Sequence, residues 1–119
     1  MTADEALLAL QQREPIFHRP ELGTDFASMV TDDFWEIGAS GKIYTREFVL
    51  SVLSERQHQK TADIWQTSDF ACRKLSDEYF LLTYNLTQDH TRQTRRTTLW
   101  FWTSEDWKIA FHQGTLVQS

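Results

Sequence analysis

Histidines are the first residues of this sequence to consider for chemistry, because an imidazole titrates near neutral pH and can give or accept a proton. There are four: His18, His58, His90 and His112. His112 lies in a predicted strand, in a row with Asp69 and Tyr84 that could orient it. As argued below from the alternation of the strands, we expect that row to face a second copy of the chain. We therefore interpret His112 first as a hydrogen-bonded interface residue. His18 follows the first predicted helix, where it could line the mouth of a pocket or lie at the surface.

Two charged residues on predicted strands are further candidates. Arg96 lies on a partly apolar face, where its planar guanidinium could hold a carboxylate or another anion. An ion pair with Glu36, Asp69 or a helix carboxylate is the ordinary alternative. Glu36 lies in a predicted hairpin and could act as a general base if it is buried. A solvent-facing position, or a partner role for an arginine, is its ordinary alternative.

The sequence predicts neither a metal site nor a cofactor. The four histidines have no ligand spacing, Cys72 is the single cysteine, and neither a Gly-rich phosphate loop nor a nucleophile elbow occurs. A single cysteine excludes an intrachain disulfide and favours a reducing, cytoplasmic compartment. The formal net charge of −5 argues against nucleic acid as a partner. The acidic start, Met1–Glu5, and the short apolar runs predict neither a signal peptide nor a membrane span.

The elements that must position these residues are helices followed by strands. Helices are predicted over Asp4–Glu14, Thr24–Val30 and Arg46–Gln57, the first ending at Pro15. A small hairpin, Phe34–Ile37 with Lys42–Tyr44, lies between the last two. Four long strands follow, Asp63–Lys74, Tyr79–Gln88, Gln93–Trp102 and Trp107–Val117, joined by short polar turns. This order predicts one α+β domain over residues 1–119.

Alternation along these strands predicts two sheet faces, each with one polar row. If every turn has four residues, one face carries the row Ser68, Asn85, Arg96 and Gln113, together with Trp100 and Phe111. The other carries the row Asp69, Tyr84, Thr97 and His112, together with Phe80, Leu82, Leu99 and Phe101. Because both faces are otherwise apolar, we expect both to be covered. The helices can cover one face, and a second copy of the chain would cover the other.

The segments Phe34–Gly41, Tyr44–Glu47 and Trp107–Thr115, in this order of elements, resemble the nuclear transport factor 2-like superfamily. The resemblance is greatest to bacterial proteins related to SnoaL-like cyclases and to the association domain of calcium/calmodulin-dependent kinase. It implies a cone-shaped, strongly curved antiparallel sheet wrapped around three N-terminal helices, and homodimers through the outer sheet face. Pocket arginines of the kinase domain correspond to Asn85 and Thr98, which selects the face of Arg96 as the inner one.

We therefore predict a domain that binds an unidentified small organic molecule in an aromatic-lined pocket. The predicted ligand-binding residues are Trp35, Asn85, Arg96, Trp100, Phe111, Gln113, His18 and Glu36. One alternative is a lyase, isomerase or cyclase that transfers protons without a cofactor, with Glu36 or His18 carrying a displaced pKa. The other is a non-catalytic dimerisation or assembly module in which the aromatic residues close the core.

Overall fold

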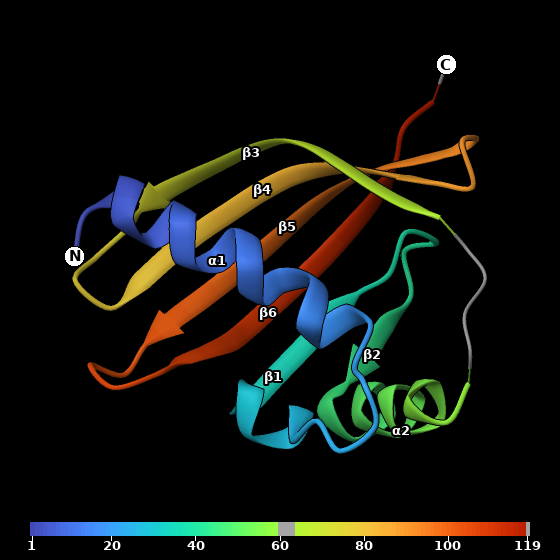
Figure 1. Ribbon diagram of the computed structural model, residues 1–119, viewed down its shortest axis with the longest axis horizontal. Helices are drawn as coiled ribbons and strands as arrows, with labels where there is room; N and C mark the ends of the chain where they lie inside the picture. Colours follow the sequence, from blue (N-terminus) through green and yellow to red (C-terminus); the bar gives the residue numbers. More distant parts are fainter. Residues whose placement is uncertain (60–63, 119) are drawn as a thin grey trace.

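The computed structural model describes residues 1–59 and 64–118, which form two α-helices, a short 3₁₀ helix and one six-stranded sheet (Figure 1). In chain order these are α1 (Ala3–His18), η1 (Phe26–Met29), β1 (Val30–Ile37), β2 (Ile43–Thr45), α2 (Arg46–Gln57), β3 (Trp65–Lys74), β4 (Tyr79–Gln88), β5 (Arg92–Trp102) and β6 (Trp107–Leu116). The α+β class is confirmed. The predicted start of the first long strand, Asp63, lies outside the described residues.

Helix α1 begins at a capping box and continues past its proline. Thr2 Oγ1 accepts from the Glu5 backbone N–H at 3.1 Å, and the Glu5 side chain accepts from the Thr2 N–H at 2.9 Å. The predicted end at Glu14 is wrong, because the last turn continues to His18. Pro15 removes one amide donor, but the buried side chains of that turn hold it against the sheet. The extra turn places Glu14 and His18 on one helix face.

The second predicted helix is instead a single 3₁₀ turn, so the expectation of three N-terminal helices is wrong. Asp25 caps η1 by accepting from the Ser28 N–H at 3.4 Å. The chain then enters β1 at Val30, four residues before the predicted start at Phe34. The helix predicted over Arg46–Gln57 is confirmed as α2, with Thr45 as its N-cap.

The sheet has the order β2-β1-β6-β5-β4-β3 and is mixed rather than wholly antiparallel. Strand β1 runs parallel to β6, and the other neighbouring pairs are antiparallel. The parallel pair joins segments from opposite ends of the chain. A hairpin turn cannot specify such a pair, because parallel strands need a long crossover connection.

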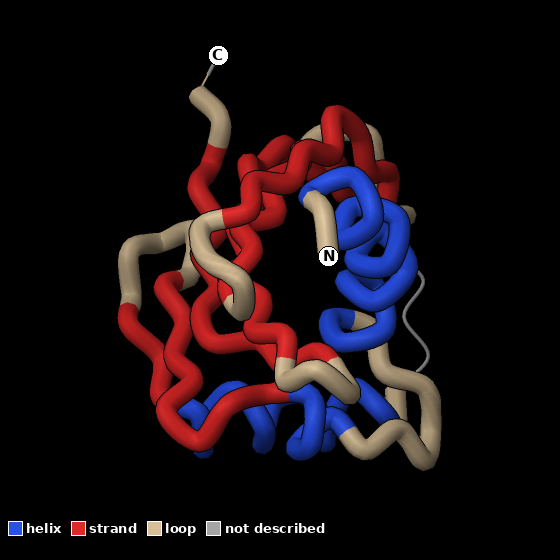
Figure 2. The backbone as a smooth tube through the Cα atoms, turned by 90° about the vertical axis from the view of Figure 1, so that its left-hand side faces the viewer, coloured by secondary structure: helices blue, strands red, loops and turns tan. Residues whose placement is uncertain are grey.

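Both α-helices lie on the same side of a curved sheet. Helix α1 packs against β3 and β4, and α2 packs against β1 and β2. Figure 2 shows the strands bending around α1, with α2 along the adjoining edge. We call the helix-covered surface the inner face and the opposite surface the outer face. The core between helices and sheet is apolar, with Leu10, Phe17, Phe34, Leu53, Phe80, Leu82, Leu86, Trp100 and Ile109 almost wholly buried.

The register differs from the prediction at three places, and each difference moves side chains between faces. The turn after β4 has three residues, with positive φ at Asp89 and His90, so Gln88 pairs with Arg92. Irregularities interrupt the pairing in β3, between Ser68 and Ala71, and in β6, opposite Leu99 and Trp100. Because a one-residue slip exchanges the two faces, the predicted polar rows are wrong.

The inner face carries Tyr84 beside Arg96, and Thr98 beside His112. Tyr84 and His112, predicted to face a dimer partner, are therefore buried beneath the helices. Asn85, Leu99, Phe111 and Gln113 take the outer face, and with them lie Leu81 and Thr97.

Candidate functional site

A buried carboxylate, Glu14, lies where α1 crosses the inner face. Its side chain is 1% exposed. Oε2 accepts from the Tyr84 hydroxyl at 3.0 Å and from the Thr98 hydroxyl at 2.9 Å, and Oε1 accepts from the Trp100 indole N–H at 3.0 Å. The three donors come from β4 and β5, where alternation points them toward the helix. Glu14 is thus held by neutral donors from two strands.

His18, one turn further along α1, completes the surroundings of Glu14. Its Nε2 lies 2.5 Å from Glu14 Oε2, and both side chains are buried. Burial by itself raises the pKa of Glu14. The charge and hydrogen bond of His18, the charge of His112 and the Thr98 hydroxyl outweigh burial and lower the pKa to about 2. Glu14 is therefore ionised at neutral pH.

A second carboxylate–imidazole pair lies next to the first. His112 on β6 donates through Nδ1 to Glu36 Oε1 on β1, at 2.8 Å. His112 is buried, and its Nε2 has no hydrogen-bond partner among the described residues. The Glu36 side chain is 21% exposed. Burial raises the pKa of Glu36, but the hydrogen bond and charge of His112, with the charges of His18 and Arg96, lower it overall.

The two pairs meet through their imidazoles. The ring centroids of His18 and His112 lie 4.5 Å apart. We call Glu14, His18, His112 and Glu36 the Glu–His cluster. Burial, followed by the charge of His18, lowers the pKa of His112. The cluster is a continuous line of polar groups from the buried interior to the partly exposed Glu36.

An apolar cavity of about 240 Å³ opens beside Glu36, between the end of α1, the β1–β2 hairpin and α2. Its walls are mostly aromatic and aliphatic, with three charged or polar side chains. The lining residues are Phe17, His18, Glu36, Tyr44, Phe48, Val49, Val52, Leu53 and Arg56. This combination is typical of small-molecule sites. We call it the inner cavity.

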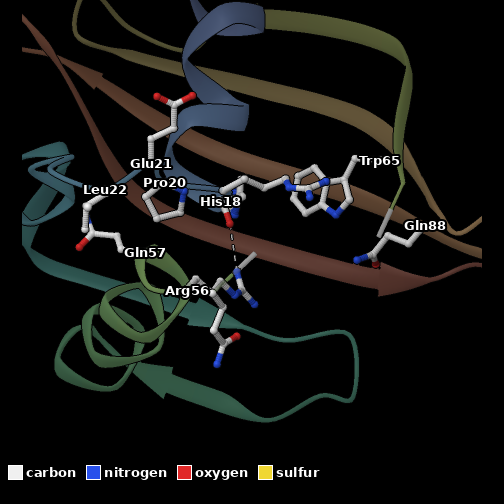
Figure 3. Close-up of a pocket in the computed structure, with 10 residues that line it drawn as sticks. His18, Pro20, Glu21, Leu22, Arg56, Gln57, Trp65 and Gln88 are labelled. Carbon is white, nitrogen blue, oxygen red and sulfur yellow. Dashed lines mark hydrogen bonds between the residues drawn. The ribbon is translucent and has the colours of Figure 1, made fainter. Parts of the chain in front are cut away.

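A second and more polar hollow, of about 380 Å³, lies at the end of α1 (Figure 3). It shares His18 and Arg56 with the inner cavity. The Arg56 guanidinium donates to the His18 carbonyl oxygen at 3.2 Å and so ties α2 to the end of α1. The Arg19 guanidinium lies 5.3 Å from the centre of the Trp65 ring. Compared with the inner cavity, this hollow has a larger share of polar groups in its walls.

The structure brings two of the predicted ligand-binding residues, His18 and Glu36, to the inner cavity. Trp100 and Arg96 lie on the inner face but away from that cavity. Trp100 is fully buried as a donor to Glu14. The Arg96 guanidinium lies over Gly114, where an added Cβ would meet it at 3.1 Å, and burial lowers its pKa. Trp100 therefore supports the site from within the core, whereas Arg96 is half-buried and donates to Thr94 at 3.0 Å.

The other four predicted residues lie on the outer face. Trp35 and Phe111 pack together with ring centroids 4.6 Å apart. Asn85 donates to Asp69 at 2.8 Å, and Gln113 pairs with Thr97 and Ile37 in the sheet. The structure therefore does not assemble Trp35, Asn85, Phe111 and Gln113 with His18 and Glu36.

Sequence reasoning missed Glu14 altogether. The signal that could have found it is the spacing of four residues between Glu14 and His18, which places both on one helix face. The predicted helix end at Glu14 concealed that spacing. No local signal marks the meeting of His18 with His112, since these residues lie 94 positions apart.

Comparison with known proteins identifies the fold. The chain matches no protein-family model and no curated protein. Among solved structures, it is 19% identical to a nuclear transport factor 2-like protein from Cytophaga hutchinsonii, over 98% of this chain and 100% of that one, with a TM-score of 0.73. An uncharacterised Caulobacter vibrioides protein with a cystatin-like fold is 16% identical, over 98% and 90% of the two chains, with a TM-score of 0.77.

A third similar structure, from Parabacteroides distasonis, belongs to a protein proposed to be a ketosteroid isomerase. It is 16% identical, over 92% of this chain and 86% of that one, with a TM-score of 0.69. These matches confirm the predicted resemblance at the level of the fold: the chain has the nuclear transport factor 2-like, cystatin-like α+β fold. Within residues 1–59 and 64–118, neither helix is long and apolar enough to cross a lipid bilayer.

Proposed function

We propose that this cone-shaped domain binds a small, partly apolar organic molecule in the inner cavity. The observation that carries the proposal is the ionised Glu36 carboxylate in the wall of a mostly apolar cavity. Six of the nine lining residues supply aromatic or aliphatic surface, and Glu36 supplies a hydrogen-bond acceptor of fixed orientation. A ligand with a hydroxyl or amine at one end and a short hydrocarbon body fits this chemistry.

The geometry favours Glu36 as a binding group. His112 holds its Oε1 at 2.8 Å, which fixes the carboxylate before any ligand arrives. The lowered pKa keeps Glu36 ionised and also makes it a weak base. An acceptor that is ionised and pre-oriented strengthens a hydrogen bond to a ligand but gains little from abstracting a proton.

Calorimetric titration with a panel of small alcohols, amines and carboxylic acids tests this proposal. We expect saturable binding of amines and alcohols in preference to acids. Glu36→Gln should weaken amine binding by about 10- to 100-fold, as expected for a charge-assisted hydrogen bond. Val52→Trp should abolish binding by filling the cavity. Glu55→Gln, on the exposed side of α2, is the matched control and should bind as the parent does. Binding that survives Val52→Trp would place the ligand elsewhere and overturn the proposal.

A second candidate function is proton transfer without a cofactor, in a lyase, isomerase or cyclase. It is supported by the Glu36–His112 pair beside the cavity and by similarity in fold to the Parabacteroides distasonis protein. Solvent-deuterium exchange into small ketones, followed by NMR, would reveal it. Exchange that is faster than in buffer and is lost in Glu36→Gln supports catalysis, and exchange at the rate of buffer rejects it for those substrates.

We also propose that the outer face joins two copies of the chain. The half-buried apolar side chains of Leu81, Leu99 and Phe111 run across its centre and end at the exposed Trp35. None of the described helices covers them. An apolar patch of this kind marks an interface, and a two-fold contact would pair the same patch on both copies. Sedimentation should show a dimer that Leu99→Lys converts to a monomer, whereas Gln66→Lys should leave it unchanged. A monomeric parent protein at micromolar concentration would reject the dimer.

A further inference from the structure

Three side chains of the Glu–His cluster have the composition and spacing of a metal site. One ligand atom from each of Glu14, His18 and His112 lies within 4.8 Å of the others, and all three residues are buried. Two imidazoles with one carboxylate are a common donor set for Zn²⁺, Fe²⁺ and related divalent ions. Neutral imidazole and ionised carboxylate are the forms that coordinate such ions.

An unpartnered nitrogen is an independent observation that points to a ligand. His112 is 1% exposed and donates through Nδ1 to Glu36, which leaves Nε2 as the nitrogen for coordination. Nε2 has no hydrogen-bond partner among the described residues. A buried polar atom without a partner is costly. A histidine that ligates a metal usually donates its other N–H to a carboxylate, and Glu36 occupies that position relative to His112.

Glu14 is also held in a fixed orientation by hydrogen bonds. Trp100 holds Oε1, and Tyr84 and Thr98 hold Oε2, without using either imidazole. These donors would keep the carboxylate in place while its contact with His18 is exchanged for a shared ion. Glu14 and Glu36 bring two carboxylates to the cluster. Ionised carboxylates attract and coordinate a divalent cation.

We propose that Glu14, His18 and His112 bind a divalent transition-metal ion, while Glu36 accepts the hydrogen bond from Nδ1 of His112. An ion bound there would replace the hydrogen bond between His18 Nε2 and Glu14 Oε2. His18 also lines the inner cavity, so an ion held there would lie beside space for water or an organic ligand. The proposal does not depend on the proposed organic ligand, because the ion is measured without it.

Metal content and Co²⁺ spectroscopy test the site on the full chain. After treatment with a chelator, the protein should take up one Zn²⁺ per chain from buffer, and Co²⁺ should give visible bands that Zn²⁺ displaces. His18→Gln and His112→Gln should each weaken Zn²⁺ binding by at least about tenfold. His58→Gln and His90→Asn, at exposed positions, are matched controls and should bind as the parent does. Absence of stoichiometric uptake, or loss of binding only in the surface variants, would overturn the proposal.

A second measurement requires no variant and so is independent of folding defects. In imidazole-nitrogen NMR spectra of the parent protein, Zn²⁺ should shift the ring resonances of His18 and His112 and leave those of His58 and His90 in place. Unchanged resonances of His18 and His112 at saturating Zn²⁺ would overturn the proposal even if zinc were retained.

Discussion

The two faces of the sheet treat polar and apolar side chains in opposite ways. The inner face lies under two helices and yet holds Glu14, Tyr84, Thr98 and His112, all buried. The outer face has no described helix over it and yet carries Leu81, Leu99, Phe111 and Trp35 in one row. Burial therefore does not follow apolar character alone in this sheet.

The difference shows how polar groups are tolerated in the core. On the inner face, Tyr84, Thr98 and Trp100 all donate to one carboxylate, so each donor is satisfied without water. Burying such groups is acceptable only when they are hydrogen-bonded. On the outer face of a single chain, apolar side chains meet solvent at modest cost. The inner face is therefore expected to be sensitive to substitution, and the outer face tolerant.

Removing the central acceptor should give the largest effect. Glu14→Ala leaves the Tyr84, Thr98 and Trp100 donors buried without an acceptor, and it also removes the counter-charge of His18. We expect a loss of about 3–5 kcal/mol in the free energy of unfolding, measured by urea denaturation. Gln12→Ala, at an exposed position of the same helix, should change stability by less than about 0.5 kcal/mol. Equal effects would show that the network does not stabilise the inner face.

Two neighbouring leucines on β4 allow the stability contributions of the two faces to be compared directly. Leu82 is fully buried on the inner face, and Leu81 is half-buried on the outer one. Leu82→Ala should cost about 2–5 kcal/mol and Leu81→Ala about 1 kcal/mol, by the same denaturation assay. Comparable costs at concentrations where the chain is dimeric would show that a second copy buries the outer face as well as the helices bury the inner one.

Lowering the pH should destabilise the protein through the ionisable groups buried at the inner face. A group whose pKa is depressed in the folded protein adds stability above its unfolded pKa and loses it as the pH falls. The folded pKa of His112 is below 6.5, and that of Glu14 is about 2 against an ordinary 4.5. Stability should therefore start to fall near pH 6.5 and fall most steeply between pH 4.5 and 2. Glu36→Gln should make the fall between pH 4.5 and 2 less steep, because it removes a carboxyl group whose pKa is also lowered in the folded protein. A free energy of unfolding that stays constant from pH 6.5 to 3 would contradict this account.

Matched tryptophan substitutions give the smallest expected contrast between the two faces. Trp100→Phe removes the donor to Glu14 Oε1 and should cost about 1.5–3 kcal/mol, typical for a hydrogen bond to a charged group. Trp35→Phe, on the outer face and 43% exposed, should cost less than about 0.5 kcal/mol. Thermal unfolding at pH 7 measures both. A larger loss for Trp35→Phe would reverse the proposed contrast between the faces.

The sequence by itself determined the type and order of most elements. Thr45 at the start of α2 and the β-branched and aromatic runs of the long strands act locally, because caps and alternation depend on residues a few positions apart. The same local signals, with the segments around Trp35 and Trp107, were sufficient for the resemblance that the solved structures confirm at the level of the fold.

Tertiary structure alone decided which residues meet. The three-residue turn at Asp89–Thr91 and the irregularities in β3 and β6 each shift the register by one position, and each shift exchanges the faces. Because its last turn packs against the sheet, α1 continues past Pro15 to His18. The His18 ring therefore contacts the ring of His112 on the last strand. Contacts across such distances in sequence depend on the summed geometry of every intervening turn, which no local pattern of residues records.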